Sequence, residues 1–454
     1  MSEANIARTP RAWWTDTSAR IRIALIVAGA LVLLVTAAFQ ESPLQPLVVF
    51  LACLALALVS LWRLAGGAQR AFLIDLFLGA FLLRVVAIVA SHGVLLSLGT
   101  GGFVFPDDRA YDELSWDIAR AWSGEIPGIL QRDSYLVMNY TYLLGLLYLL
   151  LGHSVVAAKV LNAAFGAVTA LATFGIAREL WDERAARLAG IVAAIFPSLL
   201  LWSLLTLKDV MVVMVASIAI WTMLRFVRHA DWKAAIVGLL ALATMEDLRA
   251  QLFLLIGWLM VVGVFAASTA PWRTRLRRGV PYAVATIAVI YLLGFSQLGL
   301  EFLTISRFQQ MERQRADDTA RTQLGGEQRP ESGNAYVAQV AYLPIGLPNV
   351  ILQPVPWTMR TPRDFAFLPE VICWYLIVVA SLAGVVEAAR KRHRAALLLG
   401  LFVLLMMMAF ALVQNNVGTL IRHRAMLLPV MIPLGAPFLL LLWGRIARRA
   451  VSEP

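Results

Sequence analysis

Two adjacent carboxylates, Asp107 and Asp108, stand near the start of the stretch "FVFPDDRAYDELSWDIARAW" (Phe103–Trp122), which follows a long apolar region. A carboxylate in such a position can take or align the proton of an attacking hydroxyl or amine. It can equally cap the N-terminus of the helix that follows, because a cap needs a short side chain with an oxygen acceptor. The residue types leave both interpretations open.

Several cations at the ends of other apolar regions are candidates for binding a phosphate group. They are Lys159, Lys208, Arg249, Arg422 and Arg424. Cations stabilise the charge of a phosphate, and the guanidinium fork matches its oxygens. Each has an alternative interpretation. Lys159 can extend to the membrane interface, Lys208 or Arg249 can form an ion pair with Asp209, and the two late arginines can anchor anionic lipid headgroups.

The composition excludes a soluble globular protein. Of the 454 residues, 60% are hydrophobic and only 15% are charged, and apolar runs of nearly bilayer-spanning length recur along the chain. The net charge of +11 comes from short basic clusters between these runs, where membrane orientation requires them, so no nucleic-acid partner is predicted. His423 is interpreted as structural, because no pair of histidine and carboxylate has the spacing of metal ligands.

The basic clusters also predict the topology, because they mark cytoplasmic loops. All clusters fall on one side only if Val155–Ala177 crosses the membrane and the tyrosine-rich run Tyr140–Gly152 lies in the outer interface. We therefore predict an all-α protein with about twelve crossings and both termini in the cytoplasm. The predicted spans are about 23–39, 47–62, 71–97, 155–177, 187–204, 209–225, 234–246, 250–268, 280–298, 369–387, 396–413 and 425–443.

This topology places the carboxylates on the extracytoplasmic side of a single membrane domain, residues 1–454. They lie in the first large external loop, residues 98–154, which should contain juxtamembrane helices. Around them, the spacing predicts an amphipathic helix with Tyr111, Leu114, Ile118 and Trp122 on one face. A second long external loop, residues 299–368, is partly flexible in this prediction and covers the site.

Four segments resemble motifs of glycosyltransferases with the so-called GT-C fold. "PDDRAYDELSWDIARAW" (106–122) is similar to the D-[DE]-x-x-Y-x-x-x-A/S pattern of bacterial lipid-A aminoarabinose transferases and protein O-mannosyltransferases. "YTYLLGLLYLLLGHSVVAAKVLNAAFGAVTAL" (140–171), "FPSLLLWSLLTLKDVMVV" (196–213) and "NNVGTLIRHRAMLLPVMIP" (415–433) resemble further motifs in the same order. One departure is that two extra crossings precede the first motif.

The resemblance implies a GT-C-like bundle that transfers a sugar from a polyprenyl-phosphate donor to an acceptor outside a bacterial plasma membrane. Asp107 would be the base with Asp108 as its partner, or the roles would be exchanged. The five cations would bind the donor phosphate, supported by Tyr111, Asp209 and His423. The partners would be the lipid-linked donor, membrane lipids and an acceptor that is a glycan, a lipid or a protein. No nucleotide is implied, although some family members use a divalent cation, which Asp107, Asp108 and Asp209 could hold.

Two other functions fit a membrane protein of this kind. A lipid-linked polysaccharide polymerase or ligase would also have many spans and a long external loop, but it relies on Arg and His in late loops rather than on an early acidic pair. A transporter or flippase of lipid-linked sugars would place polar residues near the middle of the bilayer, often in repeated halves. In this sequence the charges gather at the outer ends of spans.

Overall fold

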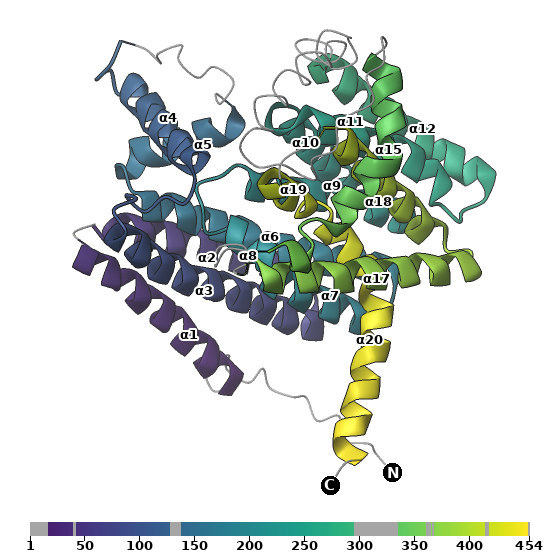
Figure 1. Ribbon diagram of the computed structural model, residues 1–454, viewed down its shortest axis with the longest axis horizontal. Coiled ribbons are helices and arrows are strands. Elements are labelled where there is room, and N and C mark those ends of the chain that lie inside the picture. Colours follow the sequence, from purple (N-terminus) through teal and green to yellow (C-terminus); the bar gives the residue numbers. More distant parts are fainter. Residues whose placement is uncertain are drawn as a thin grey trace, which may run out of the picture. The chain divides into compact units, whose positions relative to one another are not determined.

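The computed structural model describes residues 17–39, 42–127, 138–294, 335–359, 365, 367–413 and 417–452, and each regular element among them is a helix (Figure 1). The predicted all-α fold class is therefore confirmed. Most of the predicted flexible part of the loop 299–368 lies outside the described residues. The chain divides into two compact units, which are described separately below.

The first unit contains Met1–Ile129, Leu144–Ala167 and Leu204–Thr206. Its complete helices are α1 (Thr17–Leu34), η2 (Val35–Phe39), α2 (Leu44–Leu64), α3 (Gly67–Ser97) and α4 (Pro106–Trp122). It also includes most of α5 (Asn139–Leu151) and the first half of α6 (Val155–Leu180). Arg22 of α1 is held by Asp75 of α3 through two hydrogen bonds of 2.7 and 3.0 Å. Phe50 stacks on Phe81, with ring centroids 5.3 Å apart, and joins α2 to α3.

The second unit contains Leu130–Leu143, Val168–Ser203 and Leu207–Pro454. Its first complete helices are α7 (Glu183–Ile195), α8 (Pro197–Trp202), α9 (Asp209–His229), α10 (Trp232–Leu248), α11 (Ala250–Ala266), α12 (Trp272–Val289) and η4 (Ile290–Gly294). They are followed by α15 (Ala335–Leu352), η6 (Pro356–Thr358), α17 (Leu368–Arg390), α18 (Arg394–Val413), α19 (Val417–Arg424) and α20 (Leu428–Ser452).

Helices α17 and α20 cross in direct backbone contact (Figure 1). A Cβ atom added at Gly384 would overlap the main-chain carbonyl oxygen of Leu434. On the facing helix, a Cβ atom at Gly435 would lie only 2.8 Å from the Cβ atom of Ala380. Because the clashing atoms belong to backbone or to short side chains, no rotamer change can relieve the overlap. Glycine is therefore required at this crossing.

Replacing Gly384 by Ala is expected to destabilise the protein by at least about 1–3 kcal/mol, because overpacking at backbone contact forces the two helices apart. The measurement is thermal unfolding of purified protein in lipid nanodiscs, followed by tryptophan fluorescence. Gly79→Ala in α3 is the matched control, because a Cβ atom there meets nothing within 4 Å. Equal unfolding temperatures for the two variants would contradict the crossing seen here.

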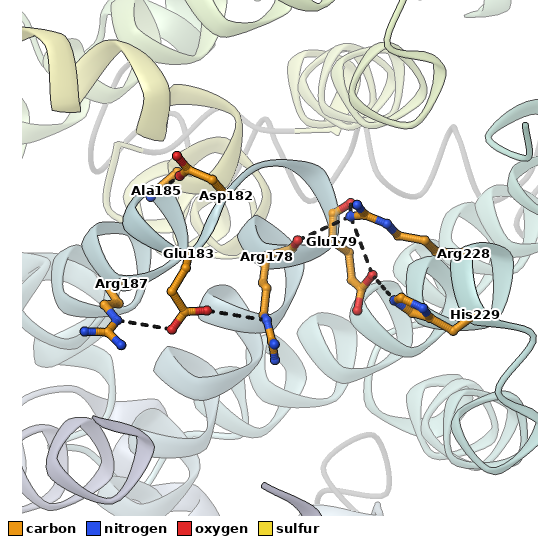
Figure 2. A network of polar contacts seen from close by, with 8 residues as sticks. All are labelled: Arg178, Glu179, Asp182, Glu183, Ala185, Arg187, Arg228 and His229. Atoms are coloured by element: carbon orange, nitrogen blue, oxygen red, sulfur yellow. Dashed lines mark hydrogen bonds and ion pairs between the residues drawn. The ribbon is translucent and has the colours of Figure 1, made fainter. Parts of the chain in front are cut away.

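A polar network joins the ends of α6 and α9 in the second unit (Figure 2). The Glu179 side chain is 7% exposed, and one of its oxygens lies 3.0 Å from Nε2 of His229. Arg228 donates to the main-chain carbonyl of Glu179 at 2.7 Å. Both partners stand in the last turn of α9, where the cationic side chain of Arg228 interacts favourably with the helix dipole.

The same network continues to the start of α7 (Figure 2). Glu183 lies 3.5 Å from Arg178 and 3.1 Å from Arg187. Asp182 caps α7 by accepting a hydrogen bond of 2.8 Å from the main-chain N–H of Ala185. Two basic clusters that the sequence assigns to the cytoplasm therefore meet at one end of the second unit.

Among the described residues, eight helices are long and apolar enough to cross a membrane, or nine if the bent pair of α19 and α20 counts as one broken span. The chain is thus a multi-pass membrane protein. The eight are Ala19–Phe39, Leu44–Leu64, Gln69–Ser97, Val155–Leu180, Asp209–His229, Trp272–Leu293, Leu368–Arg390 and Arg394–Leu412. The predicted spans 187–204, 234–246 and 250–268 correspond to shorter helices, the first of which breaks before Pro197.

Part of the predicted second loop is helical. Helix α15 contains Pro344 and Pro348, which favour a loop when the sequence is read alone. The two prolines are four residues apart and so fall on one face of the helix. Proline is tolerated in helices of membrane proteins, where neighbouring groups satisfy the freed backbone carbonyls. The later part of the loop is therefore a packed element of the second unit.

Candidate functional site

The two adjacent carboxylates of α4 lie in different environments. Asp108 is fully buried, and its Oδ1 accepts a hydrogen bond of 2.6 Å from the main-chain N–H of Thr206. The Thr206 hydroxyl contacts both the carboxylate and the carbonyl of Asp108. Oδ2 accepts from the main-chain N–H of Val104 at 3.2 Å, just before the helix begins. Asp108 thus fixes the start of α4 to the segment around Thr206.

Asp107 stands in the same first turn of α4 but is exposed to solvent. Pro106 opens the helix, as expected at a position whose N–H has no partner within the helix. Burial distinguishes the two carboxylates, because only Asp107 is accessible to a substrate.

Lys159 and Tyr111, which were predicted to take part in the site, are both buried in the first unit. Lys159 is fully buried, and its Nζ donates to the carbonyl oxygen of Gly102 at 2.5 Å. The same Nζ lies 5.9 Å from the ring centre of Phe103. Tyr111 is 4% exposed. In this structure Lys159 therefore holds the turn that leads into α4.

Most of the predicted cations of the second unit gather around a buried carboxylate, Asp209, at the first residue of α9. Asp209 is 1% exposed, and Nε of Arg422 lies 2.6 Å from its Oδ2. Arg422 Nη2 contacts the same oxygen. Arg249, between α10 and α11, approaches Oδ1 with its Nη2 at 3.7 Å. Asp209 thus orients two guanidinium groups that come from distant parts of the chain.

Lys208 adds a third cation next to Asp209. It is half-buried, and burial, followed by the guanidinium of Arg249, lowers the pKa of Lys208 to about 8 against the opposing effect of Asp209. Asp247 also favours the charged form of Lys208, while one of its own oxygens accepts a hydrogen bond of 2.6 Å from the main-chain N–H of Asn139. We call Lys208, Asp209, Arg249 and Arg422 the cationic cluster. Its three cations outnumber the buried carboxylate, as suits a site for an anion.

The two late arginines lie on opposite sides of α19. Arg424 is 2% exposed, its Nε donates to the carbonyl of Val350 at 2.7 Å, and its guanidinium lies 4.7 Å from the ring centre of Trp374. It therefore connects α19 to α15 and α17. His423 is also buried, and its ring stacks on that of Phe410 with the ring centres 5.1 Å apart. The opposite positions of Arg422 and Arg424 follow from their spacing, because residues two apart on a helix point about 200° away from each other.

Sequence reasoning missed a polar group on the buried face of α4. Asp112 accepts a hydrogen bond of 2.5 Å from the Tyr148 hydroxyl and lies 2.9 Å from Nε2 of His153. Asp112 follows Asp108 by four residues and so shares its helix face, which is the signal that could have found it. No cluster of three or more potential metal-ligating side chains occurs in the part of the chain that the structure describes.

The family model described as dolichyl-phosphate-mannose-protein mannosyltransferase matches residues 138–296, about a third of the chain. Lys159, Lys208, Asp209 and Arg249 fall within the matched segment. No curated protein matches the sequence.

Two solved structures are similar to the chain. An archaeal oligosaccharyltransferase, AglB from Archaeoglobus fulgidus in complex with an inhibitory peptide and a dolichol-phosphate, is 15% identical with a TM-score of 0.52, over 86% of this chain and 52% of that one. ArnT from Cupriavidus metallidurans bound to undecaprenyl phosphate is 18% identical with a TM-score of 0.46, over 78% of this chain and 59% of that one. The chain thus spans between half and three fifths of their lengths. The likeness to AglB confirms the predicted GT-C fold.

Proposed function

We propose that this protein is a membrane glycosyltransferase that transfers a sugar from a polyprenyl-phosphate donor to an acceptor at the outer face of a bacterial plasma membrane. The family match and the GT-C fold support this class of enzyme. A polymerase or ligase and a flippase are less favoured. The charged groups described above stand at the ends of α4 and α9, whereas a flippase places them near the middle of the bilayer.

The observation that carries the proposal is the cationic cluster. Transfer of a sugar from a lipid phosphate leaves negative charge on the departing phosphate, and fixed cations stabilise that charge as it develops. Arg422 and Arg249 are held by Asp209 before any ligand arrives, so little reorganisation is needed. Lys208 supplies a further charge that Asp209 does not neutralise. The cluster therefore suits a lipid phosphate.

The reaction follows from these roles. The acceptor hydroxyl or amine attacks the anomeric carbon and forms the new glycosidic bond. The bond between that carbon and the phosphate oxygen breaks, and its electron pair leaves with the polyprenyl phosphate. Asp107 takes the proton of the attacking group, because it is the accessible carboxylate of the pair. Asp108 positions the start of α4 through Thr206 and Val104.

The extracytoplasmic location is supported by the two ends of α9. The polar network with Arg228 and His229 lies at its last turn, and Asp209 is its first residue. A helix of 21 residues is about 30 Å long, close to the thickness of the hydrocarbon core. Basic clusters favour the cytoplasmic side, so we assign Asp209 to the outer side.

The predicted cover of the site, the loop 299–368, also remains part of the proposal. Helix α15 is the longest helix of this loop among the described residues, and Arg424 donates to its main-chain carbonyl at Val350. Arg424 is on the same short helix as Arg422. The end of α15 is therefore attached to the element that carries a cation of the cationic cluster. This arrangement supports the proposal that the loop acts at the site.

The test of the function is an incubation of purified protein in nanodiscs with a panel of polyprenyl-phosphate sugars. We expect release of free polyprenyl phosphate, by hydrolysis or by transfer, from at least one member of the panel. Heat-inactivated protein is the control. If no donor is cleaved while sealed vesicles show movement of intact donor between leaflets, the protein is a flippase and the proposal is wrong.

The lowered pKa of Lys208 predicts how donor use depends on pH. Its pKa is lowered to about 8, so it is charged below this value and neutral above it. We expect kcat/KM for the donor to fall as the pH rises through about 8, because a cation is lost from the phosphate site; kcat/KM reports the free enzyme. In Lys208→Arg this fall should disappear, since arginine stays charged.

The control for the pH profile is Lys233→Arg, at the opposite end of the second unit's helices and outside the cationic cluster. Its profile should match that of the unmodified protein. An alkaline fall that persists unchanged in Lys208→Arg would show that another group controls donor use in this range.

A further inference from the structure

The polar group on the buried face of α4 combines a fixed carboxylate with an accessible imidazole. Asp112 is 2% exposed, whereas the His153 side chain that it binds is 37% exposed. Tyr148 donates to the other oxygen of Asp112 at 2.5 Å. All three residues belong to the first unit. Asp112 therefore orients an imidazole that a ligand can reach.

An indole lies beside this imidazole. Trp116, one helical turn after Asp112, is half-buried, and its ring centre is 5.3 Å from that of His153 and 6.4 Å from that of Tyr148. The Tyr148 and His153 rings meet edge to face at 5.0 Å. The three rings contact one another, and those of Trp116 and His153 are partly exposed while Tyr148 is buried behind them. Aromatic groups beside a few placed polar groups are the composition typical of small-molecule sites.

The helices that carry Trp116 and Tyr148 are held rigidly. At Gly145 of α5, a Cβ atom would lie 2.7 Å from Cγ2 of Ile118 and 3.3 Å from the carbonyl oxygen of Ser115, both on α4. The close approach fixes Tyr148 of α5 relative to the α4 face. A surface held in this way loses little entropy when it binds a ligand.

The hydrogen bond to Asp112 also sets the chemistry of the imidazole. When Nε2 of the neutral ring donates to Asp112, Nδ1 is the acceptor. A hydroxyl can donate to such a nitrogen. The flat face of the Trp116 indole can contact the apolar face of a ring compound. The neighbouring His153 imidazole then meets the polar edge of the same compound.

We propose that Trp116 and His153 form a binding surface for a sugar ring, with Asp112 and Tyr148 as positioning residues. The indole contacts the C–H face of the sugar, and the imidazole accepts a hydrogen bond from one of its hydroxyl groups. This inference deepens the proposed function and rests on it for the source of the sugar. The ring belongs to the acceptor or to the donor, and the two sources are separated by experiment.

Direct binding is tested without any donor. Protein in nanodiscs, which avoid sugar-headed detergents, is mixed with methyl glycosides of mannose, glucose and galactose, and saturation transfer to the glycosides is measured by NMR. We expect transfer to at least one glycoside, with binding about tenfold weaker in Trp116→Ala and in His153→Gln, as for the loss of one principal contact. Trp122→Ala, an exposed tryptophan of the same helix, is the control and should bind normally.

Kinetics with a cleavable donor then identify the source. If the surface binds the acceptor, His153→Gln raises KM for the methyl glycoside as acceptor about tenfold and leaves KM for donor hydrolysis unchanged. If it binds the donor sugar, the donor KM rises instead. A rise in only one of the two KM values, for the acceptor or for the donor, supports a sugar site.

The inference is overturned if no glycoside binds, or if all variants bind as well as the unmodified protein. It is also overturned if the variants lose only thermal stability, because the group would then be structural. Glycoside binding that persists in a protein unable to cleave any donor would leave this surface intact and refute the proposed transfer reaction. The two proposals therefore fail separately.

Discussion

Replacing Asp107 by Asn is expected to lower turnover of the polyprenyl-phosphate sugar by about 10²–10⁴-fold, the usual contribution of general-base catalysis. The amide has nearly the same size but cannot take the proton of the attacking group. Because Asp107 is exposed, the substitution should leave the unfolding temperature nearly unchanged. The measurements are release of polyprenyl phosphate under saturating donor and thermal unfolding of the same preparation.

Asp108→Asn is the matched control, with the opposite result. Asp108 is fully buried and accepts hydrogen bonds from Thr206 and Val104. An amide offers one acceptor where the carboxylate offers two, so a buried N–H is left unsatisfied at a cost of about 1–3 kcal/mol. We expect a lower unfolding temperature and a smaller loss of turnover. A stable but inactive Asp108→Asn beside an active Asp107→Asn would show that Asp108 is the base.

Much of the fold could be predicted because apolar run length is a local property. The run 209–225 became α9 (Asp209–His229), and the tyrosine-rich run became α5 (Asn139–Leu151). Helix α15 was missed because its prolines suggest a loop, while the packing around it decides otherwise. The crossing at Gly384 could not be predicted, since it depends on which two of many apolar helices meet.

Single residues of the candidate site could be proposed from the sequence because a charged side chain at the end of an apolar run suggests a role by itself. The cationic cluster joins Asp209 to Arg422, two residues that the sequence singled out independently. Their pairing depends on tertiary contact across 213 positions of the chain. Their spacing of two residues on a helix would have predicted that Arg422 and Arg424 lie on opposite faces. The partners of Asp112 lie 36 and 41 residues away in sequence, so no local pattern indicates them.

Replacing Arg422 by Gln is expected to affect both activity and stability. The loss of a donor aimed at developing charge costs on the order of 10²-fold in kcat. The same change removes the nearest partner of Asp209, which is 1% exposed, and removal of one partner from a buried ion pair costs about 3 kcal/mol. A fall in activity alone therefore would not distinguish a phosphate ligand from a counter-ion.

The double variant Asp209→Asn/Arg422→Gln separates the two roles. Without the buried carboxylate, the missing guanidinium no longer leaves an uncompensated negative charge, although Arg249 loses its contact with Asp209. We therefore expect the unfolding temperature to recover part of the loss. Turnover should stay low, because neither substitution restores a cation for the leaving phosphate. Arg422→Lys should be stable and intermediate in rate, since a point charge replaces the bidentate fork. If the double variant regains turnover together with stability, Arg422 serves only to neutralise Asp209, and the phosphate must be held by other groups.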